Sequence, residues 1–247
     1  MRSSSLFYLL LTAPITMSFG GPLREIKDPS TFSALVFVPP GAEGPMPLLL
    51  YLHGAGESGT SVRDLISEGA TGTPPVELEH KRALAILHKF VTVAPQTSHG
   101  WSADEVGKFT DWLVGSASTL GLPPLDTKRL YVTGHSMGGG GALLAASTRK
   151  FAACVPVAPS GSARPAELKG LPVWAFHGKN DVIVPSSISE RLIQKLRQLG
   201  ANESEAKLTL YDAAPPPKGW PDYDGHGSPM PAYATPELWR WLLEQHL

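Results

Sequence analysis

Short apolar stretches alternate with helix-forming stretches along most of this chain. The apolar stretches predict strands at residues 32–38, 48–52, 90–94, 130–134, 154–157, 173–177 and 208–211. The stretches between them predict helices at residues 76–88, 104–120, 138–147, 187–199 and 236–245. This alternation favours a mostly parallel central sheet with helices on both faces, because parallel strands need crossover connections and bury both of their sides. The sequence therefore predicts an α/β fold, and it leaves no segment for a large lid.

The composition is that of an ordinary globular protein and argues against several kinds of partner. Of 247 residues, 42% are apolar and 17% are charged, and the formal net charge is −1. This length suffices for one core, and we expect a single domain over residues 21–247. The balanced charge provides no basic stripe for nucleic acid and no polybasic patch for a membrane surface. The lone cysteine, Cys154, lies in an apolar run and is expected to pack in the core rather than to react.

Residues 1–20 are expected to form a leader. A basic start at Arg2 is followed by an apolar stretch at residues 6–11, and small residues suit a cleavage site after Gly20. The apolar stretch is too short to span a bilayer. Three interpretations stay open: a secretory signal peptide, an organelle transit peptide, since the first acidic residue is Glu25, or a leader on a cytosolic enzyme.

A serine flanked by glycines stands where a predicted strand meets a predicted helix. Residues 134–138 read Gly-His-Ser-Met-Gly. A serine in such a sharp turn points its Oγ out above the sheet from a strained backbone, and the glycines let strand and helix pass closely. The start of the helix also brings free N–H groups near that oxygen. Ser136 is therefore the candidate nucleophile.

A nucleophilic serine needs a base, and the base needs a carboxylate to hold its tautomer. Asp181 and His226 each follow a predicted strand, so we expect both at the same sheet edge as Ser136. Their order along the chain, Ser-Asp-His, is the order of α/β-hydrolases. Asp222 and Asp224 are nearer to His226 in sequence, but a carboxylate so close along the chain rarely reaches the far ring nitrogen. Asp181 is the favoured carboxylate.

A glycine-rich loop upstream is the candidate oxyanion hole. The strand at 48–52 runs directly into the loop at 53–59, which reads His-Gly-Ala-Gly-Glu-Ser-Gly. Glycines leave backbone N–H groups uncovered, which suits an oxyanion hole formed by the N–H groups of Ala55 and Met137. Each such donor is worth on the order of a hundred- to a thousandfold in turnover. Glu57, in the same loop, is either a solvated charge or a polar contact near these donors.

Taken together, these motifs resemble the α/β-hydrolase superfamily. The motifs that carry the resemblance are His-Gly-Ala-Gly at 53–56, Ala-Pro-Gln at 94–96 with Gly-Trp at 100–101, Gly-His-Ser-Met-Gly-Gly at 134–139, His-Gly at 177–178 with Asp181 and Val-Pro at 184–185, and Gly-His at 225–226. Within the superfamily, the chain is similar to the small lid-less carboxylesterase and phospholipase group that includes acyl-protein thioesterases, and to dienelactone-hydrolase-like esterases. The resemblance covers about residues 30–247.

This resemblance implies an enzyme and a role for each candidate residue. Ser136 would be the nucleophile, His226 the general base and acid, Asp181 its orienting carboxylate, and Ala55 with Met137 the oxyanion donors. We therefore expect a serine hydrolase that cleaves small-molecule carboxylic esters through an acyl-enzyme, with no metal or other cofactor. A thioesterase or small peptidase with the same apparatus, and a non-catalytic binding protein on the same fold, are the alternatives.

Other polar and aromatic residues near the motifs have more ordinary interpretations. Trp101 and Trp220 are candidates for lining the acyl or alcohol pocket, although a loop tryptophan is as often a plug over the core. His53 and His177 follow strands and are expected to bond loop backbone rather than to act as bases. His135 flanks the serine and is expected to pack into the protein.

Overall fold

An eight-stranded sheet forms the centre of the computed structural model, which describes residues 22–161 and 164–247. The strands are β1 (Leu23–Lys27), β2 (Ser33–Phe37), β3 (Met46–Leu52), β4 (Val91–Pro95), β5 (Leu125–His135), β6 (Ala153–Val157), β7 (Val173–Gly178) and β8 (Ala206–Tyr211). Their spatial order is β1-β2-β4-β3-β5-β6-β7-β8. The pairs from β4 to β8 are parallel, and β2 pairs antiparallel with both β1 and β4. The predicted mostly parallel sheet is confirmed.

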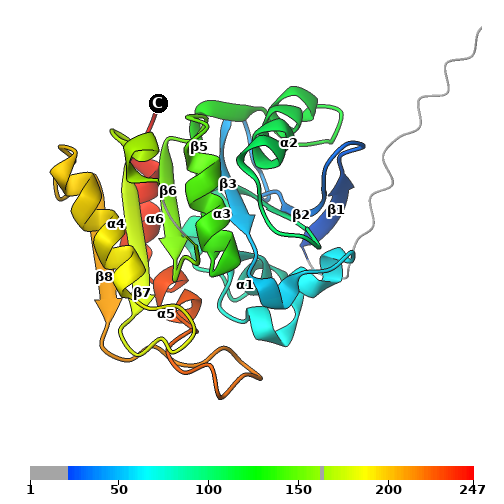
Figure 1. The fold of residues 1–247 in the computed structure, drawn as a ribbon. Helices are drawn as coiled ribbons and strands as arrows, with labels where there is room; N and C mark the ends of the chain where they lie inside the picture. The colour runs from blue at the N-terminus through cyan, green and yellow to red at the C-terminus, as the bar shows by residue number, and fades with distance from the viewer. Residues whose placement is uncertain (1–21, 162–163) are drawn as a thin grey trace, which may run out of the picture.

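Helices cover both faces of this sheet. The α-helices are α1 (Pro74–Glu79), α2 (Ala103–Ser116), α3 (Met137–Ala146), α4 (Ser187–Gln198), α5 (Pro229–Tyr233) and α6 (Pro236–Leu243). Short 3-10 helices are η1 (Ala55–Glu57), η2 (Val62–Ile66), η3 (Glu68–Ala70), η4 (Ala85–Lys89) and η5 (Pro165–Leu168). Figure 1 shows α3 and α4 over the near face and α6 over the far face.

The alternation of side chains along the strands accounts for the two layers of core. On β3, Leu48, Leu50 and Leu52 pack into the cluster that includes residues of α2, α3 and α4. Leu49 and Tyr51 point the other way, into the cluster that includes residues of α1 and α6. Because both faces are covered, the strand is apolar throughout rather than alternating with polar residues. Cys154 lies fully buried in the first cluster, as expected.

The predicted helix at 76–88 is wrong. α1 ends at Glu79, and a separate 3-10 helix, η4, covers Ala85–Lys89. Lys81 adopts a positive φ of 57°, and the N–H groups of Arg82 and Ala83 both bond back to the carbonyl of Glu77. A left-handed residue breaks the helical repeat, so the apolar spacing continues across two short elements rather than one helix.

One β-strand and one α-helix were missed by the sequence pattern, besides short 3-10 helices. β1 is an edge strand in which Arg24, Glu25 and Lys27 leave few apolar positions to signal a strand. α5 is a single short helix in the proline-rich region, where proline at its first turn begins the helix. The predicted strand at 130–134 lies within β5, which begins five residues earlier, at Leu125 rather than 130.

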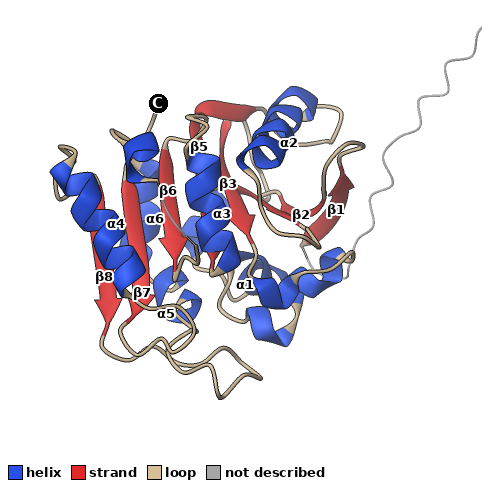
Figure 2. Cartoon of the chain, in the orientation of Figure 1, coloured by secondary structure: helices blue, strands red, loops and turns tan. Residues whose placement is uncertain are grey.

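The loops of interest gather at one edge of the sheet. Figure 2 shows the long loop between β8 and α5 at the edge where the strand arrows of β6, β7 and β8 end. Within the described residues, no separate lid covers that edge, and none of the helices has the length and apolar character needed to span a bilayer. The predicted leader at 1–20 lies outside the described residues.

Candidate active site

Ser136 stands on a tight turn between β5 and α3. Its backbone has φ 54° and ψ −117°, an unfavourable conformation for a residue with a Cβ atom. Its N–H donates to the Val157 carbonyl at 2.9 Å, and its own carbonyl accepts from the N–H groups of Ser160 and Gly140 at 2.9 and 3.0 Å. These bonds to β6, to the loop after β6 and to α3 hold the strained turn in place.

The glycines on either side of Ser136 are required by close backbone packing. A Cβ at Gly134 would collide with the carbonyl of Gly138, and a Cβ at Gly138 would collide with the carbonyl of Leu52 on β3. Glycine is therefore the residue that lets α3 leave the sheet directly beneath the serine. This local geometry explains why the Gly-His-Ser-Met-Gly pattern predicts a sharp strand-to-helix turn.

Ser136, His226 and Asp181 form a continuous hydrogen-bonded chain. His226 Nε2 lies 3.0 Å from Ser136 Oγ, and His226 Nδ1 lies 2.8 Å from Asp181 Oδ2. Asp181 and His226 are 8% and 5% exposed, so their contact is buried, while the contact of His226 with Ser136 is partly buried. The three residues come from loops that follow β5, β7 and β8. Since β5 to β8 are parallel neighbours, these loops lie at one edge.

The Asp181 carboxylate is surrounded by donors. Its Oδ1 accepts from the N–H groups of Ile183 and Val184 at 2.9 and 2.8 Å. Burial by itself would raise the pKa of Asp181, but hydrogen bonds from His177, His226 and the Val184 N–H hold that pKa well below its usual value. Asp181 is therefore an anion at neutral pH. Asp222 and Asp224, the alternatives nearer in sequence, are exposed.

His135 contacts His226 directly, a contact that the sequence did not predict. Its Nε2–H donates to the backbone carbonyl of His226 at 2.9 Å, and the two rings lie 4.7 Å apart between centroids. Burial, with a contribution from nearby His226, lowers the pKa of His135 to about 3, so its ring is neutral. The expected inward packing of His135 is correct, but the neighbour against which it packs is His226.

The two candidate oxyanion donors begin helices. Ala55 is the first residue of η1 and Met137 is the first residue of α3, and N–H groups in a first turn have no acceptor within their helix. Gln96 braces the upstream loop, because its side-chain amide donates to the carbonyls of Glu57 and Ser61 at 2.9 and 2.8 Å. The loop that contains Ala55 is thereby tied to the residue following β4.

Glu57 is a buried carboxyl in this loop. It is 7% exposed, and its Oε2 is buried without a hydrogen-bond partner among the described residues. Burial raises the pKa of Glu57, while hydrogen bonds from the N–H groups of Gly54 and of Glu57 itself and the nearby His226 act in the opposite direction. Of the two open interpretations, the solvated charge is wrong, because burial places this side chain in a polar contact beside the candidate oxyanion donors.

A cavity of about 370 Å³ opens at Ser136. Its lining includes the loop at 54–57 and Ile183, Pro217, Trp220 and Tyr223. Trp220 and Tyr223 are 47% and 36% exposed, and their rings lie 5.1 Å apart. The mouth of the cavity is therefore apolar and partly aromatic, which suits the hydrocarbon portion of a small molecule.

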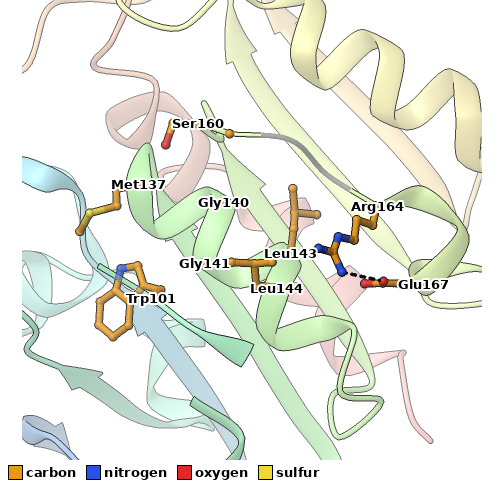
Figure 3. A pocket seen from close by; sticks show the side chains of 10 residues that line it. Trp101, Met137, Gly140, Gly141, Leu143, Leu144, Ser160, Arg164 and Glu167 are labelled. Atoms are coloured by element: carbon orange, nitrogen blue, oxygen red, sulfur yellow. Dashed lines mark hydrogen bonds and ion pairs between the residues drawn. The ribbon is translucent and has the colours of Figure 1, made fainter. Parts of the chain in front are cut away.

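Trp101 lies outside this cavity. Its indole N–H donates to the His53 carbonyl at 3.0 Å, and its ring packs edge-on against Phe32. It lines a separate cavity of about 200 Å³ with Met137, shown in Figure 3, where Arg164 and Glu167 form an ion pair at the far side. The structure thus brings Trp220, rather than Trp101, to the cavity at Ser136.

His53 has the structural role expected from the sequence. His53 is fully buried, with Nε2 accepting from the Thr97 N–H at 3.1 Å, so it bonds loop backbone as predicted. Among the described residues, no group of three or more His, Cys, Asp or Glu side chains has the arrangement of a metal site.

The fold and site have known counterparts. A model of the PET hydrolase-like family matches residues 106–209, a segment that includes Ser136 and Asp181 but not His226. No functionally curated protein matches the chain. Solved structures match along almost its whole length, and with the sheet topology they show that the chain has the α/β-hydrolase fold, in agreement with the resemblance of its motifs.

The similar solved structures include esterases and a dienelactone hydrolase. A thermostable esterase is 27% identical with a TM-score of 0.70, covering 92% of this chain and 64% of that one. The chain thus spans slightly less than two thirds of that esterase. A putative dienelactone hydrolase from Klebsiella pneumoniae is 18% identical (TM-score 0.60, covering 89% and 97%), and an esterase from Thermogutta terrifontis is 16% identical (TM-score 0.59, covering 91% and 92%). At these lower identities, the likeness shows the fold.

Proposed function

We propose that this protein is a serine hydrolase that cleaves carboxylic esters through an acyl-enzyme intermediate. The observation that carries the proposal is the unbroken chain from Ser136 Oγ to His226 to the Asp181 carboxylate, at 3.0 and 2.8 Å. A serine is a weak nucleophile unless an adjacent base takes its proton, and this chain supplies both the base and the anion that orients it. The similarity to a thermostable esterase, at 27% identity, supports the same proposal.

In the first half of the reaction, Ser136 Oγ attacks the ester carbonyl carbon while its proton passes to His226 Nε2. The negative charge of Asp181 stabilises the resulting imidazolium through His226 Nδ1. The carbonyl oxygen, now an oxyanion, accepts hydrogen bonds from the N–H groups of Ala55 and Met137. His226 then gives its proton to the leaving alcohol, and the acyl group remains on Ser136.

In the second half, water replaces the alcohol. His226 takes a proton from the water as its oxygen attacks the acyl carbon, and the same donors hold the second oxyanion. Collapse of this intermediate releases the carboxylic acid and returns the proton to Ser136. No step requires a metal or an organic cofactor.

The substrate is proposed to be a small ester with an apolar acyl or alcohol part. The cavity at Ser136 has the size of small-molecule sites, and Ile183, Trp220 and Tyr223 give it an apolar mouth. Thioesters are open to the same attack, and a substrate profile separates these activities.

The test measures hydrolysis of p-nitrophenyl esters, from acetate to palmitate, by the purified protein and two variants. Ser136→Ala should abolish turnover and leave the far-UV circular dichroism spectrum unchanged. Ser160→Ala is the matched control, because Ser160 contacts Ser136 through its backbone N–H rather than its hydroxyl, and we expect it to keep most of the activity.

A fluorophosphonate probe provides a second readout that does not depend on the choice of ester. The probe should label the wild-type protein and the Ser160→Ala variant but not Ser136→Ala. Failure of every ester and of the probe would overturn the proposal in favour of a non-catalytic binding protein on this fold.

A further inference from the structure

His177 lies at the end of β7 and is completely buried. Its Nδ1 lies 2.8 Å from the Ser189 hydroxyl on α4, and its Nε2 lies 2.9 Å from the Val184 carbonyl. The same Nε2 is 3.3 Å from Asp181 Oδ2, the oxygen that also contacts His226. The sequence predicted that His177 satisfies loop backbone, and the Val184 contact agrees. The contact with Asp181 is additional.

The Val184 contact places a proton on His177 Nε2, because a carbonyl oxygen can only accept a hydrogen bond. Nδ1 is in contact with the Ser189 hydroxyl, which is itself fully buried and holds the ring in its orientation. The Nε2–H faces both the Val184 carbonyl and the Asp181 carboxylate.

That N–H completes the set of donors around the carboxylate. Asp181 Oδ1 is held by two backbone N–H groups of its own loop. With Oδ1 held, the carboxylate can still pivot about that oxygen and displace Oδ2. On Oδ2, the His177 N–H approaches from β7 and the His226 N–H from the loop after β8. His177 stands at the end of β7 and is itself held by Ser189 on α4. The position of Oδ2 is therefore fixed through His177 by both of these elements.

We propose that His177 is a positioning residue for the reaction, one that holds Asp181 Oδ2 in line with His226 Nδ1. This inference rests on the proposed function. His177 touches neither the cavity nor Ser136, so it acts only through Asp181. Without its N–H, the carboxylate swings on its Oδ1 anchors and the contact with His226 lengthens. The imidazolium that forms during attack is then less stabilised, which lowers kcat and leaves substrate binding unchanged.

A matched pair of amide variants isolates this N–H. In His177→Gln, the amide nitrogen stands four bonds from Cα, as Nε2 does in histidine, and can donate to the same acceptors. In His177→Asn, the amide is one bond shorter and cannot reach them. Both variants lose the imidazole ring and place a neutral amide at the same buried position. A difference between them therefore reports on whether the amide reaches the acceptors. Ser189→Ala is a milder third variant, which keeps the ring and removes the hydroxyl that fixes its orientation.

We expect His177→Asn to lower kcat by about 10- to 100-fold with KM unchanged, as for a lost charge-assisted hydrogen bond. We expect His177→Gln to stay within about threefold of wild type. A lost contact also makes His226 easier to deprotonate, so the acid limb of the kcat/KM profile of His177→Asn should move to lower pH, while that of His177→Gln should not.

This pH signature depends on the groups that face His226. They are Asp181 in the loop after β7, with His177 behind it, neutral His135 on β5, Glu57 on η1, and Tyr223 in the loop of His226 itself. Of the groups in contact with His226, Asp181 is the one that His177 touches, so a shift of the His226 titration on substituting His177 is attributable to that carboxylate.

An NMR titration of the His226 ring keeps the inference separate from the proposed function. If the wild-type protein hydrolyses no ester, the proposed function fails, yet the titration midpoint of His226 still falls in His177→Asn and not in His177→Gln if His177 positions Asp181. Equal effects of Gln and Asn, or an unmoved midpoint in a folded His177→Asn protein, would overturn the inference. If both amide variants fail to fold, Ser189→Ala decides: a midpoint lower than wild type supports it, and an unchanged midpoint rejects it.

Discussion

Replacing Asp181 by asparagine tests the orienting role of the carboxylate with almost no change in shape. Two backbone N–H groups donate to Oδ1, so the oxygen of the new amide must occupy that side. The NH2 group is then forced to the position of Oδ2, where it faces His226 Nδ1 at 2.8 Å. A donor cannot face a donor, so His226 must turn Nδ1 into an acceptor and carry its proton on Nε2 instead.

That tautomer has no lone pair for the proton of Ser136. By comparison with other serine hydrolase triads, a wrong tautomer costs about 10⁴-fold in kcat. We expect the kcat of Asp181→Asn to be about 10³- to 10⁴-fold lower than that of wild type, which corresponds to about 4–5.5 kcal/mol of transition-state stabilisation. KM should change little, because Asp181 does not line the cavity at Ser136.

The assay is steady-state hydrolysis of whichever p-nitrophenyl ester the wild type cleaves fastest, measured at neutral pH. Asp222→Asn and Asp224→Asn are matched controls, since both carboxylates are exposed and close to His226 in sequence. We expect both to retain activity within about threefold of wild type. A loss of less than tenfold in Asp181→Asn, or a larger loss in either control, would refute the reasoning from the position of the amide.

Two further substitutions test the surroundings of Ser136. Burial raises the pKa of Glu57, so its contribution to stability is full below the unfolded pKa and is lost as pH rises through the folded value. The side chain in Glu57→Gln cannot ionise, so the stability of this variant relative to wild type should increase between pH 4 and pH 8. At pH 8 we expect the variant to have gained about 1 kcal/mol in free energy of unfolding, or about 2–4 °C in Tm, relative to wild type. Thermal denaturation at several pH values measures this, and a difference that does not depend on pH contradicts it. Trp220→Ala should lower kcat/KM about tenfold for long-chain or bulky esters and leave acetate hydrolysis unchanged, because a half-exposed indole at the mouth contacts only larger substrates. An equal loss on acetate would show that Trp220 supports the loop rather than the substrate.

The sequence was sufficient to predict features that depend on the path of the backbone, namely the strands, their shared edge and the turn at Ser136. The apolar runs predicted the parallel strands, because a strand buried on both faces must be apolar throughout, and strand ends of one parallel sheet must share an edge. Asp181 and His226 could be chosen for the same reason. The turn at Ser136 was also readable, since the glycines at 134 and 138 are required by contacts that no other residue allows.

The sequence was insufficient where side chains from distant segments meet. Nothing local distinguishes Trp101 from Trp220, yet Trp101 is held under the loop by the His53 carbonyl and Trp220 stands at the mouth of the cavity. Likewise, the pattern placed His135 and His177 near the motifs but not against His226 and Asp181.

The two kinds of information differ in range. Hydrophobic periodicity and glycine requirements act between residues close in sequence or between neighbouring strands, so the sequence by itself determined the layered α/β fold, the turn at Ser136 and the edge at which Asp181 and His226 gather. Hydrogen-bond partners, burial and tautomers depend on which loops pack together across the sheet edge. The tertiary structure alone therefore decided the buried state of Glu57, the aromatic mouth of the cavity, and the N–H of His177 that faces the Asp181 carboxylate.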